Sequence, residues 1–194
     1  MPTENKVFYG LSNVHIVPVT AVSNGVPTYG TPFKFPGAVA WGEEPEGENT
    51  PFRADNTNYY VSAGNDGYTG DLEVARVIDE FATKIYGMKT GSNGELIEVV
   101  TAEAKPFAMI VQIEGDQGAT RYVYPWCTAE RASADHATTE EGAIEPGTET
   151  IPVSCKPLYI DGIGDVVKYR VKKDASNYDT ILSTFALPTS VTSA

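Results

Sequence analysis

The chain has 194 residues, of which 41% are hydrophobic and 21% are charged, a composition sufficient for one well-packed core. Its 26 Asp and Glu residues outnumber its 14 Lys and Arg residues, so the net charge is −12. Because duplex DNA carries one negative charge per about 1.7 Å of its axis, this balance argues against a protein that grips DNA electrostatically. No secretory signal is expected in the N-terminal MPTENKVFYG, and no segment is apolar enough to predict a membrane span.

Apolar residues recur at every second position along most of the chain, and this period predicts β-strands. In chain order, the predicted strands are residues 7–19, 29–37, 58–63, 69–77, 95–101, 107–115, 120–132, 148–157 and 166–173. The segments between them are rich in Gly, Pro, Asn and Asp, which are typical of turns. Residues 107–127 read as a hairpin whose two apolar runs are joined by GDQGA.

One segment, VIDEFATKIYG at residues 77–87, has a helical period instead. Val77, Ile78, Phe81, Ile85 and Tyr86 share one face of a helix, and the following glycine is placed to end it in the left-handed conformation. We therefore expect a mainly β fold, a β-sandwich with one flanking helix that covers its core. The last residues, LSTFALPTSVTSA, are rich in Ser and Thr and predict a frayed or extended arm.

Cysteine and histidine are scarce. Cys127 and Cys155 form no C-x-x-C motif. A disulfide between neighbouring strands is possible, but two buried free thiols are the better prediction for a chain made in a reducing compartment. A zinc site built from His15, His136 and the cysteines would need distant segments to converge without any spacing signal, so no metal or cofactor is predicted.

Motifs of catalysis are missing from the sequence. There is no G-x-S-x-G, H-E-x-x-H, P-loop or complete G-x-G-x-x-G, and DGIGD at residues 161–165 reads as a turn. GNDGYTGDLE at residues 64–73 lacks the ligand order of an EF-hand and reads as a hairpin turn. Two carboxylates could meet in a pair like that of a glycosidase. In a chain with so many Asp and Glu residues, however, such a pair is weak evidence for catalysis. The sequence therefore predicts a protein that is not an enzyme.

Several segments follow one another in a recognisable order: PFRADN followed by YY, and GYTGDLE followed by DEF, are the most specific, and YGTPFKFPGAV, KPFAMIVQIEGD, YPWCTAERA and EPGTETIPVSCKP add to them. This order resembles the major tail proteins, or tail tube proteins, of long-tailed phages of Gram-positive bacteria. The resemblance covers residues 6–173, which we expect to form one tail-tube domain, with 174–194 as a C-terminal arm or extension.

The resemblance implies a β-sandwich with a flanking helix, whose subunits form hexameric rings that stack into a tube. Genomic DNA would pass through the lumen without specific binding, and the neighbours would be other tail proteins such as the tape measure, tail terminator and distal tail protein. The chain would be made in the bacterial cytoplasm and end in the virion. An acidic lumen would repel DNA during transit. The candidate lumenal residues are Glu43, Glu44, Glu46 and Glu48, or Glu140, Glu141, Glu145 and Glu149, with solvated outer loops as the alternative.

The resemblance also places a long inter-strand loop at residues 42–58, where the family reaches the neighbouring ring. Aromatic and Arg side chains suit such an interface, and amides suit its rim. The candidate contact residues are Phe52, Arg53, Asp55, Asn56 and Tyr59, and Arg53 and Asp55 could pair with each other. Alternatively, the aromatic residues of this stretch plug the edge of the sandwich.

A carbohydrate-binding module is the alternative function. Modules of this class stack sugars on exposed aromatic rings, and Trp41 and Trp126 could form such a platform. Trp126, within YVYPWC, also reads as part of a core strand.

Overall fold

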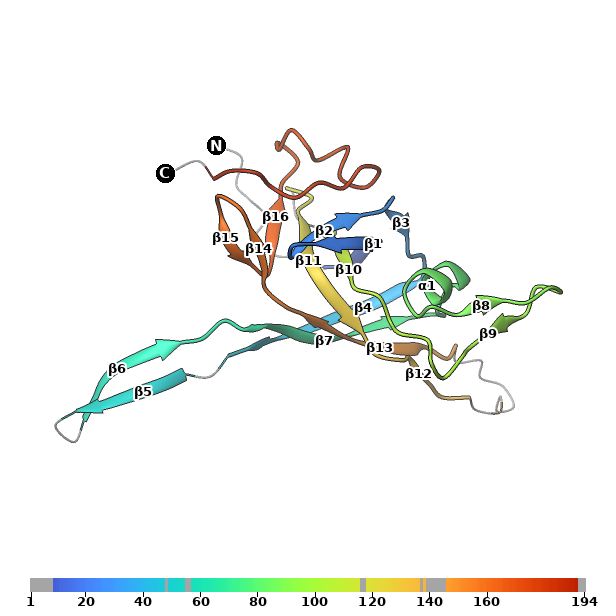
Figure 1. The fold of residues 1–194 in the computed structure, drawn as a ribbon, viewed down its shortest axis with the longest axis horizontal. Coiled ribbons are helices and arrows are strands. Elements are labelled where there is room, and N and C mark those ends of the chain that lie inside the picture. The colour runs from blue at the N-terminus through green and yellow to red at the C-terminus, as the bar shows by residue number, and fades with distance from the viewer. Residues whose placement is uncertain are drawn as a thin grey trace.

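The computed structural model describes residues 9–47, 49–54, 57–115, 118–136, 138 and 146–191. The elements of these residues are β1 (Leu11–Ser23), β2 (Val26–Tyr29), β3 (Phe33–Lys34), β4 (Ala38–Glu46), β5 (Asn49–Ala54), β6 (Thr57–Ala63), β7 (Gly67–Val74), α1 (Asp79–Lys84), β8 (Lys89–Thr90), β9 (Leu96–Ile97), β10 (Phe107–Ile113), β11 (Arg121–Ala129), β12 (Ser133–Ala134), β13 (Glu149–Cys155), β14 (Leu158–Ile160), β15 (Gly164–Val166) and β16 (Tyr169–Val171). The fold is mainly β with one short helix in the described residues, as the sequence predicted (Figure 1).

Ten of the described strands belong to one antiparallel sheet. Its main path runs β2-β1-β10-β11-β13-β7-β4, and β3, β12 and β16 pair with β1, β13 and β11. Two-stranded ladders join β5 to β6, β8 to β9, and β14 to β15. Because this path is continuous, the strands that face each other across the core belong to one sheet.

The sheet curls around a core on one face, which we call the front core. Strands β1 and β7 are separated in the sheet by three others, yet Ile16 and Leu72 belong to the same buried cluster, and β1 also approaches β4 at the far end of the path. The members of the front core are Val14, Ile16, Phe33, Phe35, Leu72, Val74, Phe81, Ala82, Ile85, Tyr86, Phe107, Met109, Val111, Tyr124, Cys127, Ala129, Ile151, Val153 and Cys155.

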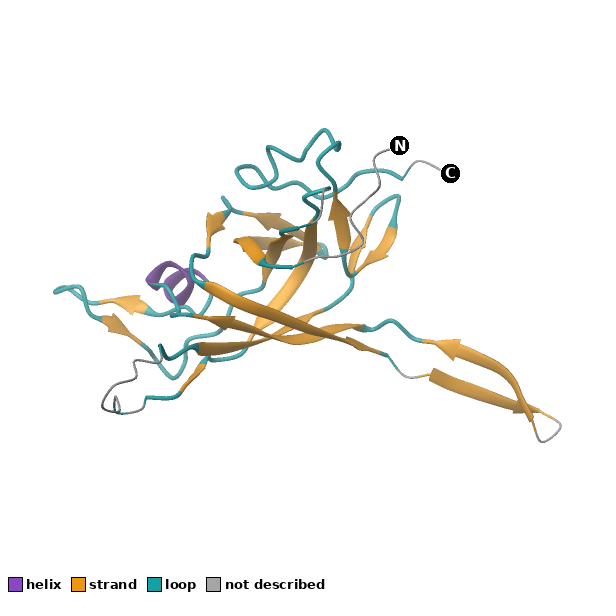
Figure 2. Cartoon of the chain, turned by 180° about the vertical axis from the view of Figure 1, so that it is seen from behind, coloured by secondary structure: helices purple, strands orange, loops and turns teal. Residues whose placement is uncertain are grey.

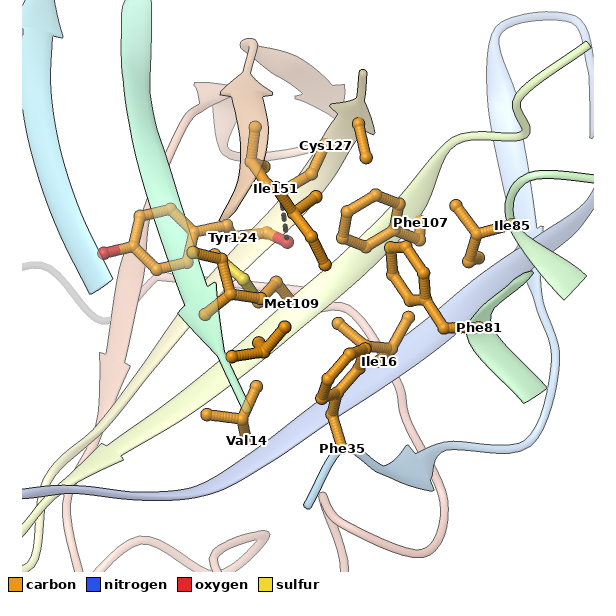
Figure 3. Close-up of a cluster of buried hydrophobic side chains, with 14 of the residues drawn as sticks. Val14, Ile16, Phe35, Phe81, Ile85, Phe107, Met109, Tyr124, Cys127 and Ile151 are labelled. Atoms are coloured by element: carbon orange, nitrogen blue, oxygen red, sulfur yellow. Dashed lines mark hydrogen bonds between the residues drawn. The ribbon is translucent and has the colours of Figure 1, made fainter. Parts of the chain in front are cut away.

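Helix α1 covers the front core, as the apolar spacing predicted. Its Phe81 is fully buried and meets the rings of Phe35, Tyr86 and Phe107 edge to face, at centroid distances of 5.2, 5.0 and 5.7 Å. Figure 3 shows Phe81 and Ile85 directed toward Phe107. The helix is shorter than the predicted segment and ends before Gly87, whose φ of 70° is the left-handed conformation expected there.

The opposite face of the sheet carries a second buried cluster, which we call the back core: Val17, Ala108, Ile110, Val123, Val171, Tyr178 and Ile181. Its cover is the C-terminal segment, and Tyr178 and Ile181 are only 7% and 1% exposed. The Tyr29 and Phe185 rings also meet edge to face, with centroids 4.6 Å apart. The frayed or extended arm was predicted for residues 182–194. Of these, residues 182–191 form no strand or helix, and Leu182 and Phe185 pack against the back core, so the arm stays a prediction. The domain boundary at residue 173 stays a prediction.

Candidate functional site

A long two-stranded ribbon leaves one edge of the sheet. The ladder of β4 and β7 runs from Ala38 opposite Val74 to Glu46 opposite Gly67, and the ladder of β5 and β6 follows it from Asn49 opposite Ala63. Figures 1 and 2 show β5 and β6 extending away from the body on the side opposite α1. We call β5, β6 and their connections the arm, and the ends of β4 and β7 next to it the arm root.

The expected loop at residues 42–58 is therefore mostly paired strand. The resemblance placed a loop there, but the strands of this stretch pair antiparallel, β4 with β7 and β5 with β6, and satisfy each other's backbone groups. Two glycines permit the close approach. A Cβ on Gly70 would lie 1.9 Å from the carbonyl oxygen of Gly42, and a Cβ on Gly47 would lie 2.2 Å from that of Gly64. Residues with side chains would push the strands apart there.

The predicted contact residues fall on the arm. In the backbone register, Phe52 is opposite Tyr60 and Arg53 is opposite Asn58, with a register shift between the two pairs; Tyr59 is the next residue of β6. Asp55 and Asn56 lie outside the described residues. The structure thus places Phe52, Arg53 and Tyr59 on one projecting hairpin, and their role as contacts stays a prediction.

The arm root is fastened to the body by a chain of polar contacts. The indole N–H of Trp41 donates to the hydroxyl of Tyr124 over 3.1 Å, and that hydroxyl donates to Glu43 Oε2 over 2.7 Å. Lys168 Nζ then donates to Glu43 Oε1 over 2.8 Å. Burial, together with the neighbouring Glu43, raises the pKa of Tyr124 far above its usual range, so its hydroxyl stays a neutral donor.

Lys168 closes this network from the loop between β15 and β16. Its ammonium lies 4.1 Å from the centroid of the Tyr68 ring on β7, so it contacts both strands of the arm root. Farther out, Lys156 pairs with Glu46 on β4. Because Glu43 and Lys168 are both half-buried, their pair is screened less than an exposed one. The network therefore ties both strands of the arm root to β11 and to the loop between β15 and β16.

The glutamates predicted to line the lumen are found in three situations: some form ion pairs or hydrogen bonds, one is exposed, and the rest lie outside the described residues. Glu43 and Glu46 pair with Lys168 and Lys156, and their lumenal position stays a prediction. Glu44 is exposed, has no ion pair among the described residues, and with Asp71 and Glu130 lines a hollow of about 540 Å³. Glu149 accepts the backbone N–H of Val77 over 2.6 Å and so holds the start of the helical segment. Glu48, Glu140, Glu141 and Glu145 lie outside the described residues.

The tryptophans do not form the aromatic platform of a carbohydrate-binding module. Trp41 is half-buried against the front core, its ring meets that of Tyr124 edge to face at 5.8 Å, and its N–H is used internally. Trp126 is half-buried on β11 and belongs to neither core. No observation in the described residues favours the sugar-binding alternative.

Other kinds of site are not visible in the described part of the chain. No group of three or more His, Cys, Asp and Glu side chains there could hold a metal ion. Helix α1, the one helix among the described residues, is far too short to cross a membrane. The free thiols predicted for Cys127 and Cys155 are confirmed as buried and unlinked.

Sequence reasoning missed the network at the arm root. Glu43 is 81 residues from Tyr124 and 125 residues from Lys168. No spacing rule connects residues so far apart. The alternation of β4 could have indicated that Trp41 and Glu43 share one face of the strand, but not which partners they meet.

The chain was also compared with known proteins. No family model matches it, and no curated protein matches it. Among solved structures, one chain from "Cryo-EM structure of the anti-feeding prophage (AFP) baseplate, 6-fold symmetrised" is similar with a TM-score of 0.42 and 8% identity, over 84% of this chain and 95% of that chain. A TM-score below 0.5 is too low for this similarity to carry an argument about fold or function.

Proposed function

We propose that this chain is a structural phage protein, the major tail protein whose hexameric rings stack into the tail tube. In this role the protein is made in the bacterial cytoplasm, assembles with copies of itself and with other tail proteins, and forms the conduit through which genomic DNA passes into the host. It is not an enzyme and requires no cofactor. The proposal starts from the sequence resemblance of residues 6–173 to that family.

The structural observation that carries the proposal is the arm. A hairpin of two strands continues the β4–β7 ladder beyond the body, and an isolated hairpin gains little stability from its own two strands. Such an extension is stabilised when it packs on another surface, and identical subunits in a ring offer that surface repeatedly. The network of Trp41, Tyr124, Glu43 and Lys168 supports the same role, because it anchors the β4–β7 ladder from which the arm extends.

The net charge of −12 agrees with a conduit for DNA. An exposed carboxylate such as Glu44 repels phosphate, so DNA does not adhere while it moves. A mobility-shift assay at low salt, where screening is weakest, tests this point with assembled material and duplex DNA. No shift is expected, and tight binding under these conditions contradicts the repulsive lumen.

The decisive experiment removes the arm and leaves its root. Because the chain approaches itself closely at Gly47 and Gly64, residues 49–63 can be replaced by a short Gly/Ser turn without disturbing the β4–β7 ladder. We expect thermal unfolding close to that of the parent, but no tubes by electron microscopy, because every subunit loses the same contact. Normal tubes from this variant refute the assignment of the arm. Single particles of the parent that bind polysaccharide favour the carbohydrate-binding alternative.

A milder variant tests the residues themselves. Phe52→Ala with Arg53→Ala removes an aromatic and a cation from the arm, and truncation at an interface hot spot costs ~2 kcal/mol or more per site. Lys89→Ala with Leu96→Ala is the matched control, since both residues are exposed on a different hairpin, β8–β9. Assembly should be lost in the first double variant and kept in the second. Equal assembly of both removes Phe52 and Arg53 from the interface.

A further inference from the structure

Two buried cysteines face each other across the centre of the sheet. Cys127 on β11 is directly opposite Cys155 on β13, and their sulfur atoms are 3.1 Å apart. Both side chains are fully buried in the front core, and both are free thiols. Nothing in the proposed function uses them.

The backbone geometry at this pair suits a cross-strand disulfide. Lys156 donates its N–H to the carbonyl of Trp126 over 2.9 Å, so the hydrogen bonds flank Cys127 and Cys155 instead of joining them. In such a non-hydrogen-bonded antiparallel pair the Cα atoms are about 4.5 Å apart. This spacing lies within the roughly 4.4–6.8 Å range of protein disulfides, so a bond needs side-chain rotation without strand movement.

The position of the pair in the sheet is also informative. The ladder between β11 and β13 consists of three residue pairs, whereas β13–β7 has seven and β4–β7 has eight. It is the shortest ladder on the main path, and it joins the half that carries the arm (β13, β7, β4) to the half formed by β1, β10 and β11. A covalent link here reinforces the narrowest connection between the two halves.

We propose that Cys127 and Cys155 are a thiol–disulfide modification site. The pair is reduced while the chain folds in a reducing compartment, and it becomes an intrachain disulfide when the folded protein meets a disulfide oxidant such as oxidised glutathione. The bond clamps β11 to β13 and makes the curled sheet harder to unfold. Only the reducing compartment is taken from the proposed function; the formation of the bond concerns the single chain and is tested on it.

The oxidation balances as a thiol–disulfide exchange. The thiolate of one cysteine attacks a sulfur of oxidised glutathione, which forms a mixed disulfide and releases one glutathione. The second cysteine thiolate then attacks the protein sulfur of that mixed disulfide and releases the second glutathione. Two electrons pass from the cysteine pair to the oxidant, and the two thiol protons end on the two glutathione molecules.

Burial makes this exchange slow while the sheet is closed. Both thiols are buried, so an oxidant in solvent does not reach them, and burial raises the pKa of the Cys127 thiol well above its usual range, which keeps Cys127 protonated. Exchange therefore proceeds through local opening of the short β11–β13 ladder, and it accelerates as the temperature approaches the unfolding midpoint. Once formed, the bond is protected from reductants by the same burial.

The test uses the full-length protein, purified under reductant. It is incubated with oxidised glutathione at several temperatures below its midpoint, then alkylated in denaturant and weighed intact. The expected product carries no alkyl group and is lighter than the reduced chain by the mass of two hydrogen atoms. Closing a 28-residue loop should raise the unfolding midpoint by about 7–14 °C, and a phosphine reductant added in denaturant should restore both thiols.

The single variants Cys127→Ala and Cys155→Ala are the matched controls. Each is compared with itself before and after oxidation, so a change in its basal stability does not matter, and neither midpoint should rise. The proposal is overturned if both wild-type thiols remain alkylatable near the midpoint, or if stable glutathione adducts accumulate in place of the bond. It is equally overturned if the bond forms and the midpoint stays where it was.

Discussion

The front core and the back core lie on opposite faces of the same strands, but they are covered differently. On β10, Phe107 and Met109 face the front, whereas Ala108 and Ile110 face the back. The front is enclosed by the curl of the sheet and by α1. The back is covered by residues 175–185, which form turns with no long helix or strand.

The irregular cover works because its backbone groups are satisfied locally. Ile181 donates its N–H to the carbonyl of Asn177 over 3.0 Å, and Thr184 donates to that of Thr180 over 2.7 Å. Tyr178 donates its hydroxyl to the carbonyl of Ala119 over 2.7 Å. A segment with paired polar groups and a few apolar side chains can therefore close a sheet face without regular structure. The four substitutions below test how far the two cores differ.

The largest effect is expected in the front core. Phe81→Ala removes a ring that contacts three other aromatic rings, and the closely packed surroundings cannot collapse into the space. We expect a loss of about 3–5 kcal/mol in the free energy of unfolding. Urea unfolding measures it, with Glu80→Gln on the exposed face of α1 as control. If Phe81→Ala costs less stability than Ile181→Ala in the back core, the front core is not the more sensitive of the two.

In the back core, Ile181→Ala removes the most deeply buried side chain of the C-terminal segment. We expect a loss of about 2–3 kcal/mol, at the lower end for this substitution because the cover can relax toward the sheet. Asp179→Ala, at an exposed position of the same segment, should be nearly neutral. If the Ile181 variant also unfolds like the parent, Ile181 does not help to hold the C-terminal segment on the sheet.

Arg121 tests what holds the back cover in place. Its guanidinium lies 3.7 Å from the centroid of the Tyr178 ring, donates to the carbonyl of Tyr178, and donates through Nε to Gln112 over 3.0 Å. Arg121→Lys keeps the charge but loses the planar fork, so we expect a loss of about 1–2 kcal/mol. Thermal unfolding and protease digestion of the C-terminal segment measure it, with exposed Arg170→Lys as control. Unchanged protease resistance argues against a clamp.

The smallest effect concerns pH and His15, a neighbour of Val17 on β1. Burial lowers the pKa of His15 below its usual value of 6.5. The charges of Lys34 and Arg121 lower it further, and a hydrogen bond with the backbone of Asn13 partly opposes them. The unfolded chain therefore binds this proton more readily than the folded one, so stability is full above the unfolded pKa and falls as the pH drops toward the folded pKa. Between pH 8 and 5.5 the wild type should lose more stability than His15→Gln. If the free energy of unfolding of the two proteins changes equally with pH, His15 is not the cause of the pH dependence.

Much of the fold follows from local sequence pattern. Alternation along residues 107–115 and 120–132 predicted β10 and β11, because side chains on a strand point to opposite faces in turn. The spacing of Phe81, Ile85 and Tyr86 predicted α1 for the same local reason. Residues 95–101 show the limit of this reasoning, since only Leu96–Ile97 form a strand, β9. The resemblance placed a loop at residues 42–58, whereas most of this stretch is paired strand in β4, β5 and β6, because strand pairing depends on a partner that local pattern does not reveal.

By itself, then, the sequence determined the mainly β class, the position of the helix and the excess of negative charge, and it favoured buried free thiols for both cysteines. Tertiary structure decided which residues meet: Glu43 with Tyr124 and Lys168, Cys127 with Cys155, and Arg121 with Tyr178. Periodicity reports on neighbours within a few residues, because it arises from the local geometry of a strand or helix. Contacts between residues 28 to 125 positions apart depend on strand order, register and curl, which form only when the whole chain packs.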